Sequence, residues 1–260
     1  MSDTRIALVT GANQGVGFQV AKELVANGVT VYLGARNFKH GEAAAAEIGS
    51  GAIALQIEVT DADSIAAAAE RIRTEKGRLD LLVNNAGISN TRRTSGPSDG
   101  QDGKDFMAEV TKASKASTAS LEEMHAVWDT NVFGTLAVYQ AMLPLLRDGI
   151  DPRIVNVSSS VASLTLNADP SHPYHAGYGP VYPASKTAEN AITLAIMNEL
   201  ESTNIKVNLV SPAFTSTNLN AFAGTQSVED GSREVVRVAL LGPDGPTGTF
   251  TQWENTPIPW

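Results

Sequence analysis

The stretch Thr10-Gly-Ala-Asn-Gln-Gly-Val-Gly17 stands directly after an apolar run at residues 6–9 and directly before a helical pattern. A glycine-rich turn between a strand and a helix brings the helix N-terminus to a ligand. Free backbone N–H groups and the helix dipole favour an anion such as a pyrophosphate there. A glycine triplet alone can be only a tight turn, but its place between strand and helix favours a dinucleotide cradle.

The rest of the chain repeats this strand-then-helix rhythm, which predicts an α/β fold: a single-domain, Rossmann-type, doubly wound parallel sheet with helices on both faces, spanning residues 1–260. Strands are predicted at residues 6–10, 30–34, 52–57, 81–84, 154–158, 206–211 and 248–251. Helices are predicted at residues 16–27, 41–48, 63–75, 121–146 and 181–202. Ser120 and Glu123 have the spacing of a capping box before the long central helix.

Two stretches interrupt the rhythm. Residues 91–119 are rich in Ser, Thr, Gly, Asp and Lys, which predicts an exposed insertion with one short helix near residues 106–112. Residues 167–180 hold several prolines and glycines and predict a loop beside Tyr182. That loop could shape substrate choice or be inert, and the sequence does not choose between the two.

Composition narrows the possible partners. The net charge of −9 over 260 residues argues against binding to nucleic acid or to an anionic membrane. With no cysteine there is no disulfide or thiol nucleophile, and the four histidines are read as loop or surface residues, so no metal site is predicted. Strand-like sequence begins at once, without a signal peptide, and the longest uncharged stretch is too short to cross a bilayer. We therefore expect a soluble, cytoplasmic protein.

The end of the second predicted strand bears on the choice of dinucleotide. It reads Leu33-Gly-Ala-Arg36-Asn37, without the carboxylate that would bind a ribose 2′-hydroxyl. An arginine there can pair with the 2′-phosphate of NADPH. We expect NADPH as the cofactor with Arg36 as the main contact; the alternative is that Arg36 is a solvated surface residue.

Tyr182 stands four residues before Lys186, one helical turn away on the same face. Hydride transfer to a carbonyl leaves negative charge on oxygen, so such a site needs a proton donor. A phenol with the ordinary pKa of about 10 is a poor donor at neutral pH unless a nearby cation stabilises its phenolate. The spacing alone is a weak signal, because Tyr-x-x-x-Lys can arise by chance.

Six motifs that follow one another along the chain strengthen the signal from Tyr182 and Lys186. They are the glycine-rich stretch, Asn84-Asn85-Ala86-Gly87, Asn131 in Asn-Val-Phe-Gly, Val157-Ser158-Ser159, Tyr182-x-x-x-Lys186 and Ser211-Pro212. In this order the chain resembles the short-chain dehydrogenase/reductase family over nearly its whole length, and its carbonyl-reductase branch in particular.

The resemblance implies a role for each matching residue. Tyr182 would be the general acid in reduction, and Lys186 would lower its pKa and hold the nicotinamide ribose. Ser159 would hydrogen-bond the substrate carbonyl, and Asn131 would anchor a water that relays protons. The implied cofactor-binding residues are Gly11, Asn13, Gln14, Gly15, Val16, Gly17, Arg36, Glu58, Val59, Asn85, Ala86, Gly87, Tyr182, Lys186, Pro212 and Thr217.

Several of these assignments have rivals. Ser158, Ser159 and Ser160 are consecutive, so strand polarity does not say which faces the site, and the family register favours Ser159. Asn131 could instead be a satisfied amide inside a helix. Glu58 replaces the family's more usual aspartate, and Ala213 replaces the glycine that normally follows the proline, which puts the placement of Thr217 in doubt. Four aromatic residues are candidates for an apolar pocket: Trp128, Phe214, Phe222 and Trp253.

The sequence thus predicts an NADPH-dependent reductase of ketones or aldehydes, reversible as an alcohol dehydrogenase, with a small carbonyl or alcohol compound as substrate. One alternative is reduction of an enone C=C bond or an imine on the same scaffold. Another is an NADP-binding regulator without catalysis, which the intact Tyr182 and Lys186 disfavour. The physiological substrate, the stereochemistry and the subunit number, monomer or homo-oligomer, stay open.

Overall fold

A computed structural model describes residues 4–91, 108, 112 and 115–260. Within them, eight strands form one sheet in the order β3-β2-β1-β4-β5-β6-β7-β8, in which β8 alone runs antiparallel to its neighbour. The strands are β1 (Ile6–Val9), β2 (Thr30–Ala35), β3 (Ala52–Gln56), β4 (Leu81–Asn84), β5 (Arg153–Val157), β6 (Lys206–Val210), β7 (Phe250–Gln252) and β8 (Thr256–Pro257). The strand order reverses between β1 and β4, and a crevice opens outside the carboxyl ends of the strands at such a point.

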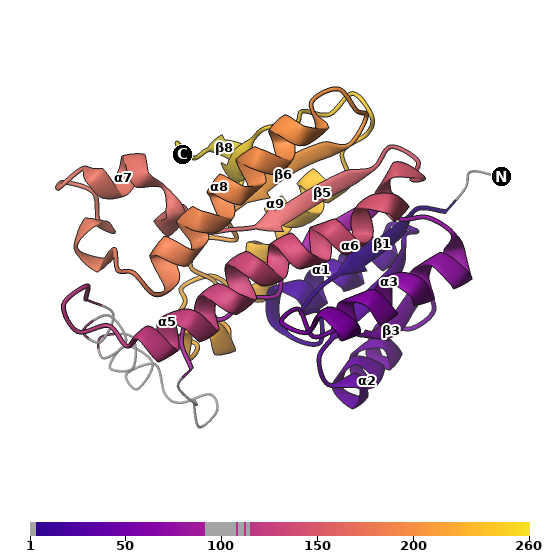
Figure 1. Cartoon of the computed structure of the whole chain (residues 1–260), viewed down its shortest axis with the longest axis horizontal. Coiled ribbons are helices and arrows are strands. Elements are labelled where there is room, and N and C mark those ends of the chain that lie inside the picture. Colours follow the sequence, from indigo (N-terminus) through magenta and orange to yellow (C-terminus); the bar gives the residue numbers. More distant parts are fainter. Residues whose placement is uncertain (1–3, 92–107, 109–111, 113–114) are drawn as a thin grey trace.

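Helices cover both faces of the sheet, which confirms the predicted doubly wound fold (Figure 1). On one face lie α1 (Gly15–Ala26), α2 (Phe38–Ile48) and α9 (Val228–Ala239), packed on side chains such as Val9 and Leu33. On the other lie α3 (Ala62–Lys76), α6 (Thr135–Arg147) and α8 (Tyr182–Leu200), packed on Leu8 and Ile154. The central strands β1, β2, β4, β5 and β6 are therefore buried on both sides, as their largely apolar sequences require, whereas both residues of β8 are exposed.

Local signals set the helix boundaries. Ser120 accepts a hydrogen bond from the Glu123 backbone N–H and begins α5 (Leu121–Trp128). Asp61 caps α3 in the same way, and Gly77 ends it in the left-handed conformation, with φ +75°. Gly28 follows α1 with φ +79°, as a residue without a Cβ can do at no steric cost.

The predicted central helix at residues 121–146 is helical throughout but not regular. Between α5 and α6 the segment Asp129–Gly134 is a π-helical turn. Such turns occur often at functional sites, because the wider spacing reorients side chains and carbonyl groups. Asn131 lies inside it.

The structure also differs from the predicted elements. α9 and β8 were not predicted, although Ser227 caps α9 through the Asp230 N–H in the usual N-terminal pattern. The loop at 167–180 contains a 3₁₀ turn at His175–Gly177, after the short helix α7 (Leu164–Ala168). Of the predicted short helix near 106–112, residues 108 and 112 are described, both as helical; the rest of it, with most of the segment 91–119, lies outside the described residues.

The described residues contain no helix with both the length and the apolar character needed to span a bilayer. They also contain no group of three or more His, Cys, Asp or Glu side chains arranged to hold a metal ion.

Candidate active site

The glycine-rich turn between β1 and α1 forms an open cradle. Gly11 and Gly15 have φ +62° and +59°, a conformation that side chains rarely adopt. A Cβ at Gly17 would collide with the Asn85 amide and the Gly11 carbonyl. Gln14, which precedes α1, makes no capping hydrogen bond with its side chain, so it leaves the N–H groups of the first helical turn available to a ligand. The cradle therefore fits a pyrophosphate.

Residues after β4 brace the cradle. The backbone N–H groups of Asn85 and Ala86 both donate to the Thr10 hydroxyl, at 3.0 Å. The Asn85 amide donates to the carbonyls of Thr10 and Gly11, at 2.9 and 3.1 Å. The Asn85 side chain thus holds the turn in shape, and this bracing role was not part of the sequence prediction.

The segment after β6 forms the opposite wall. Thr217 lies across from Gly15, with its methyl group 3.5 Å from where a Cβ would stand. Asn218 donates to the Gln14 side chain at 3.0 Å and bridges the cradle. Ala213, after Pro212, has φ +57°, so the chain keeps here the left-handed path that a glycine would adopt without strain. Thr217 therefore reaches the cradle despite the alanine.

The remaining predicted cofactor residues border the same region. Arg36 is exposed and directly follows β2. The Glu58 carboxylate accepts hydrogen bonds from the backbone and hydroxyl of Thr60, while Val59 is buried against Gly134. A hollow of about 460 Å³ adjoins the cradle and is lined by Asn13, Gln14, Phe18, His40, Ala43, Ala44 and Glu47.

The three consecutive serines after β5 have different surroundings. The Ser158 hydroxyl is buried and donates to Asn190 at 2.6 Å. The Ser160 backbone N–H donates to the Ser211 hydroxyl at 3.0 Å. The Ser159 hydroxyl accepts from the Val161 backbone N–H at 3.4 Å and lies near the Tyr182 phenol, whose pKa it lowers. Of the three, Ser159 is the one whose hydroxyl reaches Tyr182.

Lys186 is buried beneath this site. Its ammonium donates to the Val157 carbonyl at 2.8 Å and to a carboxylate oxygen of Glu189 at 2.7 Å. A Cβ at Gly87 would lie 3.6 Å from the ammonium nitrogen. The end of β4, the end of β5 and the first two turns of α8 therefore meet at Lys186.

The pKa of Tyr182 lies above its ordinary value in this structure. Burial is the largest cause, because it disfavours the phenolate, and the Glu189 carboxylate raises the pKa further. The Lys186 ammonium and the nearby Ser159 hydroxyl act in the opposite direction. The sequence predicted the lowering effect of Lys186 but not the burial and the carboxylate that outweigh it.

Asn131 is fully buried and joins three segments. Its side-chain oxygen accepts from the Ile88 N–H at 2.9 Å, and its amide donates to the Ile88 carbonyl and the Ser185 hydroxyl, at 2.9 and 3.0 Å. Its backbone carbonyl accepts from the Thr135 hydroxyl at 3.0 Å. Asn131 thus ties the loop after β4 to α8 through the π-helical turn.

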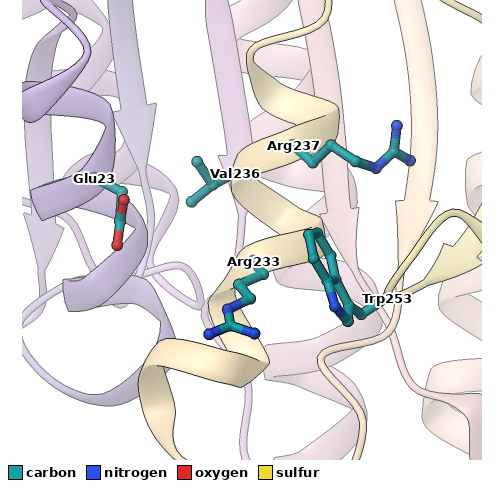
Figure 2. A pocket seen from close by; sticks show the side chains of 5 residues that line it. All are labelled: Glu23, Arg233, Val236, Arg237 and Trp253. Atoms are coloured by element: carbon teal, nitrogen blue, oxygen red, sulfur yellow. The ribbon is translucent and has the colours of Figure 1, made fainter.

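The four aromatic pocket candidates are not gathered at one place. The Trp128 indole donates to the Pro180 carbonyl at 3.0 Å and secures the entry to α8. Trp253 lines a hollow of about 230 Å³ with side chains from α1 and α9, on the face of the sheet opposite α8 (Figure 2). Trp128 and Trp253 are therefore at different places, so the four aromatic residues proposed for one apolar pocket do not share it.

This geometry agrees with the comparisons to known proteins. A family model described as short chain dehydrogenase matches residues 5–227. The chain belongs to the short-chain dehydrogenase family. Short-chain dehydrogenase anuI of Penicillium roqueforti (strain FM164) is 35% identical, over 96% of this chain and 95% of its own length. Salutaridine reductase of Papaver somniferum is 30% identical, over 95% of this chain and 93% of its own.

Solved structures of family members have the same fold. The structure of salutaridine reductase from Papaver somniferum matches with a TM-score of 0.78 and 28% identity, over 95% of this chain and 99% of that one. Menthone neomenthol reductase from Mentha piperita matches with a TM-score of 0.73 and 27% identity, over 96% and 99%. This short-chain dehydrogenase is therefore an NAD(P)-dependent oxidoreductase that acts on CH–OH or carbonyl groups.

One charged group of the site escaped the sequence reasoning. Glu189 is three residues after Lys186 and seven after Tyr182, which places all three on one face of α8. That spacing was visible in the sequence, and a search for acidic residues at helical intervals from Lys186 would have found it.

Proposed function

We propose that this short-chain dehydrogenase is an NADPH-dependent reductase of ketones or aldehydes. The observation that carries the proposal is that Ser159, Tyr182 and the buried Lys186 ammonium lie together where β5 and α8 meet. A proton donor, a second hydroxyl and a cation then converge there. A binding protein without catalysis has no need of this combination.

The residues would act as follows. NADPH, when bound, supplies the hydride that forms the new C–H bond of the alcohol. Ser159 hydrogen-bonds the carbonyl oxygen and orients it, and Tyr182 transfers its phenolic proton to that oxygen as negative charge develops there. An ammonium has three donors, and those to Val157 and Glu189 leave the third for the nicotinamide ribose. A water relay anchored by Asn131 stays a prediction.

Substitution of Tyr182 tests the chemistry. NADPH consumption is followed with a panel of ketones and aldehydes, for the wild type and Tyr182→Phe. We expect turnover of at least one carbonyl compound and a loss of about 10²–10⁴-fold in the variant, the usual contribution of a positioned acid. Turnover of none, or undiminished turnover in Tyr182→Phe, refutes the mechanism.

The preference for NADPH rests on Arg36, which is exposed at the end of β2, where the strand carries no carboxylate. The ratio of kcat/KM for NADPH over NADH is measured before and after Arg36→Asp. We expect the ratio to fall at least about tenfold and to invert, because a carboxylate repels the 2′-phosphate. Arg73→Asp, on the exposed side of α3, is the control, and an unchanged ratio in Arg36→Asp removes Arg36 from the site.

A further inference from the structure

The Glu189 carboxylate is buried next to the two groups assigned to proton transfer. Only 1% of Glu189 and 4% of Lys186 is exposed, and the charged atoms are 2.7 Å apart. The second carboxylate oxygen lies 3.5 Å from the Thr135 hydroxyl of α6. The single proton of that hydroxyl is also directed at the Asn131 carbonyl, at 3.0 Å, so the contact with Lys186 is the one that holds the carboxylate in place.

This carboxylate changes the charge balance of the site. With a neutral phenol at Tyr182, the ammonium and the carboxylate cancel, and the group of three carries no net charge. Ionisation of the phenol, in a half-buried residue, would then leave a net negative charge beside the two buried groups, which is costly. Without the carboxylate, the same ionisation would turn a buried positive charge into a neutral pair.

Charged groups on the packed elements do not offset this effect. On α5, Glu122 and His125 are exposed, while Glu123 accepts a hydrogen bond from the Thr91 backbone. Asp129 of the π-helical turn is exposed, and Lys206 begins β6 at the amino end of the strand, whereas Tyr182 lies near the carboxyl ends. The charges that act on the pKa of Tyr182 are those of Lys186 and Glu189, in opposite directions.

We propose that Glu189 is a positioning residue that keeps the Tyr182 phenol protonated by balancing the Lys186 ammonium, and so favours carbonyl reduction over alcohol oxidation. Reduction needs the phenol as an acid, whereas oxidation needs the phenolate as a base. The Glu189 carboxylate also raises the pKa of Lys186, so the cation persists in the pH range where the acid is needed. The catalytic part of this inference rests on the proposed function.

The protonation state can be measured without turnover. Tyrosinate absorbance is titrated in the cofactor-free protein for the wild type, Glu189→Gln, and each of these with Tyr182→Phe, so that the differences isolate Tyr182. We expect a wild-type midpoint above the ordinary value of about 10. In Glu189→Gln the midpoint should fall by roughly one to three pH units, the usual effect of one close charge. A wild-type midpoint at or below the ordinary value overturns the proposal, as does an unchanged midpoint in the variant.

A matched control is available in α9. Glu234 is also 1% exposed and is paired three residues on, with Arg237 at 2.6 Å, on the other face of the sheet. Glu234→Gln should leave the Tyr182 midpoint in place. An equal shift in both variants would mean general loosening and would overturn the proposal. Should Glu189→Gln fail to fold, Glu189→Leu carries the same expectation, and the wild-type midpoint still decides.

Activity supplies the second readout. The alkaline pH at which NADPH-dependent reduction is half lost should move down in Glu189→Gln by the same interval as the absorbance midpoint, with little change in KM near neutral pH. The ratio of alcohol oxidation to carbonyl reduction at neutral pH should rise. An unchanged pH profile refutes the inference. If the wild type reduces no carbonyl, the proposed function fails, while the absorbance titration still tests Glu189.

Discussion

The two helices α8 and α9 each contain a fully buried glutamate paired with a cation within one turn, yet the pairs differ in what surrounds them. Glu234 and Arg237 form a two-point contact at 2.9 and 2.6 Å, and the arginine side chain is 30% exposed. The Lys186 side chain is 5% exposed, and its pair with Glu189 lies next to Tyr182. The same sequence device therefore secures the chain on one side of the sheet and sets protonation on the other.

The α9 pair of Glu234 and Arg237 also binds a neighbouring turn of the chain. Arg237 donates to the Asn255 side chain at 2.8 Å, and Glu234 accepts from the Asn255 backbone at 3.3 Å. These contacts attach the turn between β7 and β8 to the helix. Water can reach the guanidinium, so part of its charge is solvated in any case. Depth of burial, rather than the pairing itself, separates the two sites.

Removal of the cation alone should give the largest difference. Lys186→Met leaves Glu189 buried without its partner and should lower the free energy of unfolding by roughly 3–5 kcal/mol. Arg237→Met should cost about 1–3 kcal/mol, because water can replace the partly exposed guanidinium. Urea unfolding at neutral pH measures both. Equal losses would show that burial does not distinguish the pairs.

Acidification should reduce the difference in unfolding free energy between Lys186→Met and the wild type. Burial raises the pKa of Glu189, against the opposing effects of Lys186 and Thr135, so the folded state binds its proton more readily than the unfolded chain. A carboxyl with a raised pKa loses stability as the pH rises through it, and regains stability as the pH falls. Without Lys186 the pKa of Glu189 should be raised further. Lys186→Met should therefore approach the wild type between neutral pH and about pH 5. A constant difference across this range would contradict the prediction.

Replacement of the whole pair is a sharper test. Lys186→Met with Glu189→Leu removes both charges together, and apolar residues of similar volume are often tolerated in place of a buried pair. We expect the double variant to unfold within about 1 kcal/mol of the wild type, although it has no activity. The matching change at Glu234 and Arg237 should be worse tolerated, because the contacts with Asn255 are lost. Equal losses in the two double variants would show that the contacts with Asn255 contribute nothing beyond the pair itself.

The smallest effect should come from the segment that joins β6 to α9. Ala213 has φ +57°, which costs an L-residue roughly 1–2 kcal/mol. Ala213→Gly removes that strain but adds freedom to the unfolded chain, so a gain of about 0.5 kcal/mol remains. Thermal unfolding should detect it as a small rise in Tm. A lower Tm would mean that the Ala213 methyl group makes a packing contribution larger than the strain.

Much of the fold was predictable, for reasons seen in individual segments. The runs at β1, β4 and β5 are apolar and bounded by turn residues, and Ser120 and Gly77 mark helix ends through local hydrogen bonds and conformation. β8 has only two residues, Thr256 and Pro257, which is too short to show the alternation of apolar and polar residues that marks a strand. α9 opens with the polar run Val228-Glu-Asp-Gly-Ser-Arg, and its apolar side appears only at residues 235–239.

The sequence indicates which residues form the site, but not the direction in which the pKa of Tyr182 is shifted. Tyr182, Lys186 and Ser159 are brought together as the motifs indicate. The direction of the Tyr182 pKa depends on how deeply the group is buried and on the distance to Glu189, and both are properties of the folded chain. The Asn131 amide donates to the Ile88 carbonyl and the Ser185 hydroxyl, and these residues lie far from Asn131 in the sequence. Its contacts therefore also depend on the folded chain.

The alternate orientation of Ser158 and Ser159 makes the length of β5 a determinant of the chemistry. Successive residues of a strand point to opposite faces, so one residue added within β5 would place Val157 opposite Asn190 and Ser158 beside the phenol. Asn190 would then lose its hydroxyl partner, whereas removal of one residue would bring Ser159 and Ser160 into the two places and keep a hydroxyl at each. An insertion of one residue in this strand should therefore be tolerated less well than a deletion.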